Sequence, residues 1–115
     1  METIRLGVGP GTADAVIHDG TIHLPVITAR QMTPSVSDQT QQVLDQIDER
    51  LAACGTTKFR MLSATVLIGD ARFYEEMSAS WDAWVPWHDP PVCTFLVARL
   101  APRGSKVGIQ VIVAQ

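Results

Sequence analysis

The length, composition and charge of the chain exclude several classes of protein. Its 115 residues are about the size of one ordinary domain, so we expect a single domain spanning residues 1–115. With 46% hydrophobic and 18% charged residues, the composition is that of a globular rather than a disordered protein. No apolar stretch reaches the roughly 20 residues that cross a bilayer, and no basic-then-apolar leader opens the chain, so we expect a cytoplasmic protein that does not bind membranes.

The charge balance bears on nucleic-acid binding, and the cysteines bear on disulfide formation. Nine basic residues stand against twelve acidic ones, and like charges form no run, so we expect no nucleic-acid partner. Cys54 and Cys93 are too few for a disulfide framework and are not spaced as Cys-x-x-Cys. The sequence therefore favours reduced, structural thiols, with a single disulfide left open.

The first part of the chain predicts three strands. Thr3–Val8 comes first, and the β-rich runs Ala13–Ile17 and Thr21–Ile27 follow. The dipeptide Asp19-Gly20 between the two runs suits the positive φ values of a tight hairpin turn. Pro25 cannot donate to a central ladder, so we expect it at an edge or a bulge of the sheet.

The clearest helix signal lies between Pro34 and Gly55. Apolar and small side chains recur there at steps of three and four residues: Val36, Thr40, Val43, Leu44, Ile47, Leu51 and Cys54. Ser35 or Ser37 can cap the N-terminus, and Gly55 stands where a left-handed C-terminal cap is needed. The pattern predicts one amphipathic helix with both ends defined.

A strand, a second helix and two further strands are predicted after Gly55. Alternation divides the strand Met61–Ile68 into two faces, one of which carries Leu62, Ala64, Val66 and Ile68. Asp70 caps the helix, Pro86 ends it, and its aromatic stripe indicates packing on a sheet rather than a ligand site. Two strands, Cys93–Leu100 and Lys106–Ala114, complete the chain.

The element order is therefore βββ-α-β-α-ββ, which predicts an α+β sandwich with both helices on one face of a single sheet. The other face requires a cover. In the run from Thr94 to Ala98 and again from Val107 to Val113, apolar side chains point both ways, whereas a wet sheet face alternates with polar residues. No element of the chain remains to cover that face, so we expect self-association through the sheet.

Few residues suggest chemistry on their own. Gly7-x-Gly9-x-Gly11 is a poor phosphate loop, since Pro10 removes a donor and no helix begins there. The three histidines are not at metal-ligand spacing, so neither a metal nor a cofactor is expected. A nucleophilic pair of Cys93 with His88 is conceivable, but the sequence favours a cysteine at the start of a strand that packs in a subunit contact.

Several strings, taken in order, resemble the reactive intermediate deaminase (Rid) family, also called YjgF-like or L-PSP endoribonucleases. They cover nearly the whole chain: Gln39-Thr40, Leu44 to Gly55, Ala64 to Asp70, Trp81 to Val85, Pro90 to Leu100 and Lys106 to Ala114. The resemblance implies a chorismate-mutase-like sandwich that assembles as a homotrimer, with the sheets inside and ligand clefts between subunits. Such an assembly would cover the apolar sheet face.

The family's deaminating members hold a substrate carboxylate with an Arg just after a Pro-x pair. Matching this chain backwards from Val97-Ala98-Arg99 puts Val92 at that position, whereas matching by length to Lys106 puts Cys93 there. Neither side chain can form the charge-assisted pair that Arg makes. Three further cleft positions differ from the family pattern, and they are occupied by Thr12, Ser78 and Gln110.

These departures lead to a ranked set of functions. First is a homotrimer that binds a small, uncharged or weakly charged metabolite in a cleft formed by Val92, Cys93, Thr94, Gln110, Thr12 and Ser78, without the family's hydrolysis of 2-imino acids. Second is an imine or enamine hydrolase of altered specificity that uses Cys93, Thr94 or a bound water. Third is an endoribonuclease or translation inhibitor, which the acidic charge disfavours. The cleft residues could also pack a subunit contact that binds nothing.

Overall fold

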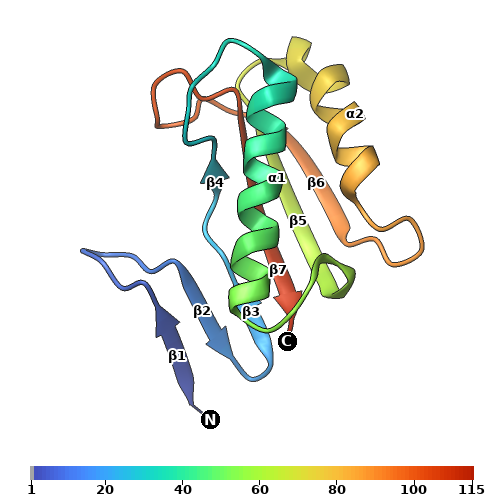
Figure 1. Cartoon of the computed structure of the whole chain (residues 1–115). Helices are drawn as coiled ribbons and strands as arrows, with labels where there is room; N and C mark the ends of the chain where they lie inside the picture. Colours follow the sequence, from blue (N-terminus) through green and yellow to red (C-terminus); the bar gives the residue numbers. More distant parts are fainter. Residues whose placement is uncertain (1) are drawn as a thin grey trace.

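The structure is a computed structural model, and it describes residues 2–115 (Figure 1). Seven strands and two α-helices make up the fold, with short 3-10 turns before β5 and α2. In chain order the elements are β1 (Thr3–Leu6), β2 (Ala15–His18), β3 (Thr21–His23), β4 (Ile27–Thr28), α1 (Val36–Ala53), β5 (Met61–Ile68), α2 (Tyr74–Trp84), β6 (Val92–Val97) and β7 (Val107–Ala114).

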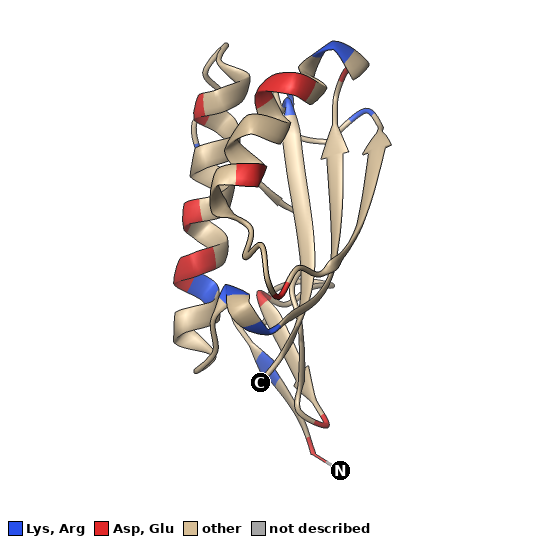
Figure 2. Ribbon diagram, turned by 90° about the vertical axis from the view of Figure 1, so that its right-hand side faces the viewer, with Lys and Arg blue, Asp and Glu red and all other residues tan. Residues whose placement is uncertain are grey.

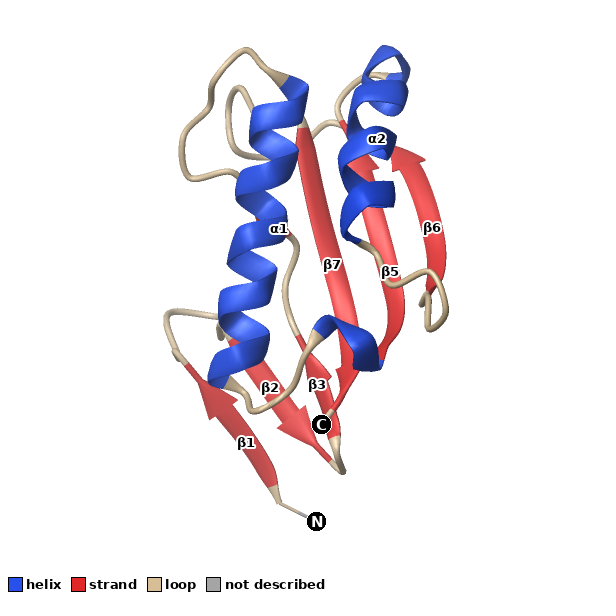
Figure 3. Ribbon diagram, turned by 45° about the vertical axis from the view of Figure 1, so that its right-hand side comes forward, coloured by secondary structure: helices blue, strands red, loops and turns tan. Residues whose placement is uncertain are grey.

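The strands form one mixed sheet in the order β1-β2-β3-β7-β5-β6, with β4 also paired to β7. All pairs are antiparallel except β5 and β6, which are parallel because α2 provides the crossover between them. Both helices lie on one face of the sheet (Figures 2 and 3). This arrangement confirms the predicted α+β class. We call the face that carries no helix the outer face.

The N-terminal hairpin forms as predicted, and the third predicted strand is interrupted. Asp19 and Gly20 have φ values of 52° and 74°, which make the tight turn between β2 and β3. The run Thr21–Ile27 divides into β3 and β4, both paired with β7. Three residues around Pro25 face two on β7 at the break, since His23 pairs with Ile112 and Ile27 with Ile109. This is the bulge that the proline predicted.

Helix α1 begins and ends where its caps predict. The Ser35 side chain accepts a hydrogen bond from the Asp38 backbone N–H at 3.1 Å, and Gly55 takes a left-handed φ of 76°. Its apolar stripe enters a core that also holds side chains from the sheet and from α2: Ile22, Leu24, Met61, Val66, Met77, Trp81, Ile109 and Val111 among others. No helix in residues 2–115 combines the length and the apolar character that a bilayer crossing needs.

Three local expectations are corrected. A register shift between Met61 and Ser63 turns Met61 into the core and leaves Leu62, expected on the same face as Ala64, 50% exposed. Asp70 caps a 3-10 turn, Ala71–Phe73, and α2 follows it directly without a side-chain cap of its own. The strand β6 ends at Val97 rather than Leu100, because its pairing with β5 runs out at Ile68.

Candidate functional site

Three rows of residues cross the outer face where β6, β5 and β7 lie side by side. Partners in register point to the same side of a sheet, so the pairing assigns each row. Written from β6 through β5 to β7, the rows are Val92-Ser63-Ile112, Thr94-Thr65-Gln110 and Leu96-Leu67-Gly108. None of these nine residues is charged. The outer face therefore presents one polar row between two more apolar ones.

The polar row offers hydroxyl groups and one carboxamide. Strand spacing places Thr94 and Gln110 about 10 Å apart across Thr65, which suits contacts to opposite ends of a small molecule. Gln110 Nε2 donates a hydrogen bond to the Leu24 carbonyl oxygen at 3.1 Å, in the bulge between β3 and β4. That bond leaves Gln110 Oε1 as an acceptor. The row therefore offers neutral hydrogen-bond donors and acceptors and no charged group.

The two candidates for the family's Arg position lie on opposite faces of β6. Val92 pairs with Ser63 on the outer face and is 74% exposed. Cys93 pairs with Ala64, whose side chain is buried toward the helices. Of the two, only Val92 shares a face with Thr94 and Gln110. A ligand on the outer face would therefore contact Val92 and not Cys93.

The remaining predicted site residues lie elsewhere in a single chain. Ser78 is one turn from both Tyr74 and Trp81 on α2, and the rings of these two residues contact Phe95 on the helix side of β6. Ser78 therefore belongs with Cys93 rather than with the outer-face rows. Thr12 lies in the loop between β1 and β2, at the opposite edge of the sheet from β6. One chain alone does not bring the six candidates together.

Both thiols favour the protonated form. Burial raises the pKa of Cys54, and partial burial raises the pKa of Cys93, above their ordinary value of 9.0. Desolvation is the only cause of the Cys93 shift, so no cation or histidine lowers the pKa of its thiol. An activated nucleophile requires a lowered pKa, and Cys93 lacks one.

We therefore expect Cys93 to react slowly with iodoacetamide at neutral pH. Because the thiolate is the reactive form, the rate should rise about tenfold per pH unit until the pH passes 9.0. Mass spectrometry of timed samples would follow the reaction, with Cys93→Ser as the control for modification at Cys54. Rapid modification that is already constant at neutral pH would show an activated thiol instead.

A shallow hollow adjoins the start of β6. Its volume is about 320 Å³, and it is lined by Phe59, Arg60, Met61, Leu62, Asp89, Pro90 and Ala114. The bulge that turns Leu62 outward helps to form it, and Pro90 leads the chain directly to Val92. The hollow lies beside the start of β6 and shares no residue with the three outer-face rows.

Ser63 and Thr65 lie in the outer-face rows, although sequence reasoning did not single them out. Their side chains lie between those of β6 and β7, and alternation along Met61–Ile68 does place both on one face. That β5 sits between the two C-terminal strands depends on the order of strands in the sheet. Sequence periodicity carries no information on that order.

The histidines form no metal site. His18 lies on the outer side of the N-terminal hairpin, with its Nδ1 2.8 Å from Thr3 Oγ1, and His23 pairs with Ile112 on β7. His88 is in the loop between α2 and β6. Within the described part of the chain, no three His, Cys, Asp or Glu side chains gather so that they could hold a metal ion.

Three comparisons relate the chain to known proteins. The family model described as Endoribonuclease L-PSP matches residues 12–115. A RutC family protein from Haemophilus ducreyi is 34% identical over 110 residues, which span 96% of this chain and 94% of that protein. Reactive Intermediate Deaminase A, chloroplastic, from Arabidopsis thaliana is 29% identical over 97 residues, 84% of this chain and 51% of that protein.

Solved structures agree with these relatives. A member of the YjgF protein family from Neisseria meningitidis has a TM-score of 0.95 and 33% identity, covering 100% of this chain and 96% of that one. The match confirms the chorismate-mutase-like, Rid-like sandwich that the sequence predicted. The chain therefore belongs to the Endoribonuclease L-PSP family, known also as the Rid or YjgF family.

Proposed function

We propose that this protein is a homotrimer that binds a small, uncharged or weakly charged metabolite in clefts between its subunits, without hydrolysing 2-imino acids. The observation that carries the proposal is the uncharged polar row Thr94-Thr65-Gln110, with Val92 where the family resemblance implies an Arg. A carboxylate ligand finds no cation in the three outer-face rows. Since hydrogen bonds to charged groups contribute about 1.5–3 kcal/mol each, losing one weakens carboxylate binding by about 10- to 150-fold.

The outer face supports the trimer. Val92 and Leu96 are 74% and 47% exposed, and all six residues of the edge strand β6 are exposed. An exposed apolar edge strand can pair or pack with another chain, and soluble proteins usually cover such a strand. Thr12 and β6 lie at opposite edges of the sheet, so a neighbouring copy can bring Thr12 to the β6 of the first. Thr12 of one copy then joins Val92, Thr94 and Gln110 of another on the outer face, while Cys93 and Ser78 stay on the helix side of β6.

Size-exclusion chromatography with light scattering tests the assembly. We expect a mass of three chains, and we expect Leu96→Glu to shift the protein toward monomers, because the new carboxylate would be buried without a partner. Ser37→Glu adds the same charge on the exposed side of α1 and should leave the trimer intact. A stable wild-type monomer would refute the inter-subunit cleft.

A second candidate is an imine or enamine hydrolase of altered specificity. Its support is the relative named Reactive Intermediate Deaminase A, together with the hydroxyl groups of Thr94 and Thr65 on the outer face. These hydroxyls could position a water, but no acid or base in the three rows could activate it. Ribonuclease activity is disfavoured further, because the three rows carry neither a cation nor an aromatic ring for RNA.

A further inference from the structure

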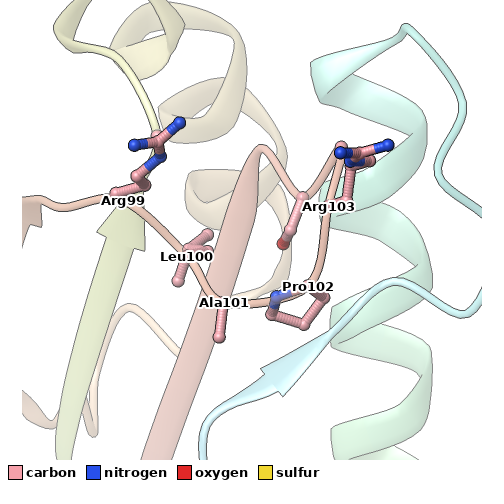
Figure 4. A pocket seen from close by; sticks show the side chains of 8 residues that line it. Arg99, Leu100, Ala101, Pro102 and Arg103 are labelled. Carbon is pink, nitrogen blue, oxygen red and sulfur yellow. The ribbon is translucent and has the colours of Figure 1, made fainter.

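A separate hollow lies at the end of β6 away from Val92. Its volume is about 330 Å³, and Gly69 and the loop Arg99–Ser105 line it (Figure 4). The loop connects β6 to β7 and passes the N-terminal end of α1. We call this hollow the 99–105 pocket. The outer-face rows contribute nothing to its lining, and nothing in the proposed function depends on it.

Two arginines stand on the two arms of this loop. Figure 4 shows the side chains of Arg99 and Arg103 rising on the same side of the loop, one from each arm. The ion pairs found among residues 2–115 join Arg30 to Glu49 and Arg72 to Asp70, so both loop guanidinium groups are without a carboxylate partner there. Two unpaired guanidinium groups beside one hollow, in a protein of net charge −3, favour an anionic ligand.

The carboxylates of the flanking segments are already engaged. The Asp38 carboxylate, in the first turn of α1, accepts hydrogen bonds from Thr33 Oγ1 at 2.7 Å and from Gln42 Nε2 at 3.1 Å. Asp70, next to Gly69, pairs with Arg72 at 2.9 Å. Because these two carboxylates already have partners, they do not pair with the arginines of the loop. An anion that binds at the loop therefore has little competition from neighbouring carboxylates for the two arginines.

Hydrogen bonds hold the loop in place before any ligand arrives. Gln39 is fully buried, and its Nε2 donates to the Gly104 carbonyl oxygen at 3.0 Å while its Oε1 accepts from the Lys106 N–H at 2.9 Å. The Gly69 N–H donates to the Lys106 carbonyl oxygen at 2.9 Å. A Cβ at position 69 would lie 3.3 Å from the Ser105 carbonyl oxygen, so glycine permits this close approach. A preordered loop loses little entropy on binding.

We propose that the 99–105 pocket binds a phosphoryl group, as free phosphate or as the phosphate of a small monoester, between Arg99 and Arg103. A guanidinium group is a planar fork that matches phosphate oxygens two at a time. A phosphoryl group has enough oxygens to serve two arginines at once, whereas a carboxylate has only two. The Lys106 ammonium, 4.6 Å from the Phe73 ring centre, adds positive charge at the same end of the sheet.

Calorimetry and NMR titration of the full-length protein with inorganic phosphate test this site. We expect saturable binding in the millimolar range or tighter, with the largest amide shifts in residues 99–106 and weaker binding of acetate. Arg99→Gln and Arg103→Gln should each weaken phosphate binding about tenfold or more, since each removes charge-assisted hydrogen bonds. Arg60→Gln, which removes an exposed arginine at the other end of the sheet, should leave the affinity unchanged.

Titrations with different ligands distinguish the possible sources of the phosphoryl group. If a small phosphate monoester binds more tightly than inorganic phosphate, and the two variants lose that binding, the phosphoryl group comes from a phosphorylated metabolite. If the two ligands bind equally well, the ligand is free phosphate. The proposal is overturned by no saturation with phosphate, by equal weakening in Arg60→Gln, or by preferential binding of acetate. Single-stranded RNA that binds far more tightly than either phosphate probe, through the same arginines, would also overturn it. Each result is independent of the trimer's cleft.

Discussion

The variant Val92→Arg is expected to bind small carboxylates such as pyruvate about 10- to 150-fold more tightly than the wild type. Val92 is exposed on the outer face, in the row next to Thr94, Thr65 and Gln110. A guanidinium group there could pair with a carboxylate in two hydrogen bonds, while the polar row holds the rest of the molecule. Calorimetry with pyruvate measures the gain directly.

Cys93→Arg is the matched control, because it adds the same group one residue along the same strand. Its side chain points to the helix face of β6, with Ala64. We expect no gain in carboxylate affinity from this variant. Equal gains from both variants would indicate attraction by charge alone, and a gain from Cys93→Arg only would show that the cleft lies on the helix side. No gain from either would count against the outer-face site.

The largest loss of stability is expected for Gln39→Leu. Gln39 is fully buried and contacts three backbone groups: it donates to the carbonyl oxygens of Thr33 at 2.6 Å and Gly104 at 3.0 Å, and it accepts from the Lys106 N–H at 2.9 Å. Leucine would leave all three without that partner. An unsatisfied buried group costs about 1–3 kcal/mol, but these three backbone groups are only part-buried, so we expect the free energy of unfolding to fall by roughly 3–6 kcal/mol, in the lower part of the summed range.

Gln46→Leu provides the comparison on the same helix. Gln46 is also buried, but it makes one such bond, from its Nε2 to the Thr28 carbonyl oxygen at 2.9 Å. Urea unfolding should show a loss of about 1–3 kcal/mol for this variant, clearly less than for Gln39→Leu. Equal losses would mean that the number of bonds to the loop is not what makes Gln39 important. A domain of this size has only about 5–15 kcal/mol to lose.

The secondary structure could be predicted because its signals are local. Ser35 and Gly55 define the ends of α1, and Asp19 and Gly20 take the positive φ values that the hairpin needs. Leu62 shows the limit of such reasoning. Alternation placed it on one face with Ala64, Val66 and Ile68, but one irregular pairing step next to Met61 turned it outward. A bulge depends on the partner strand, and no local pattern reports it.

The candidate site could be predicted only in part, for the same reason. The resemblance identified Val92, Thr94 and Gln110, and the strand register places them on one face. The choice between Val92 and Cys93 required the register of β6 against β5, since neighbouring residues on a strand point to opposite sides. Thr65 required the strand order, and the 99–105 pocket required the close approach of Gly69 to Ser105. Each depends on contacts between distant parts of the chain.

The decay of 2-iminopropanoate is the most direct test of the account. An amino-acid oxidase generates the imine, and its loss is followed with and without this protein. The uncharged row on the outer face and the raised pKa of Cys93 lead us to expect the same decay as in buffer. Acceleration in proportion to protein concentration, abolished by Thr94→Val or Cys93→Ala, would contradict the account and establish the hydrolase.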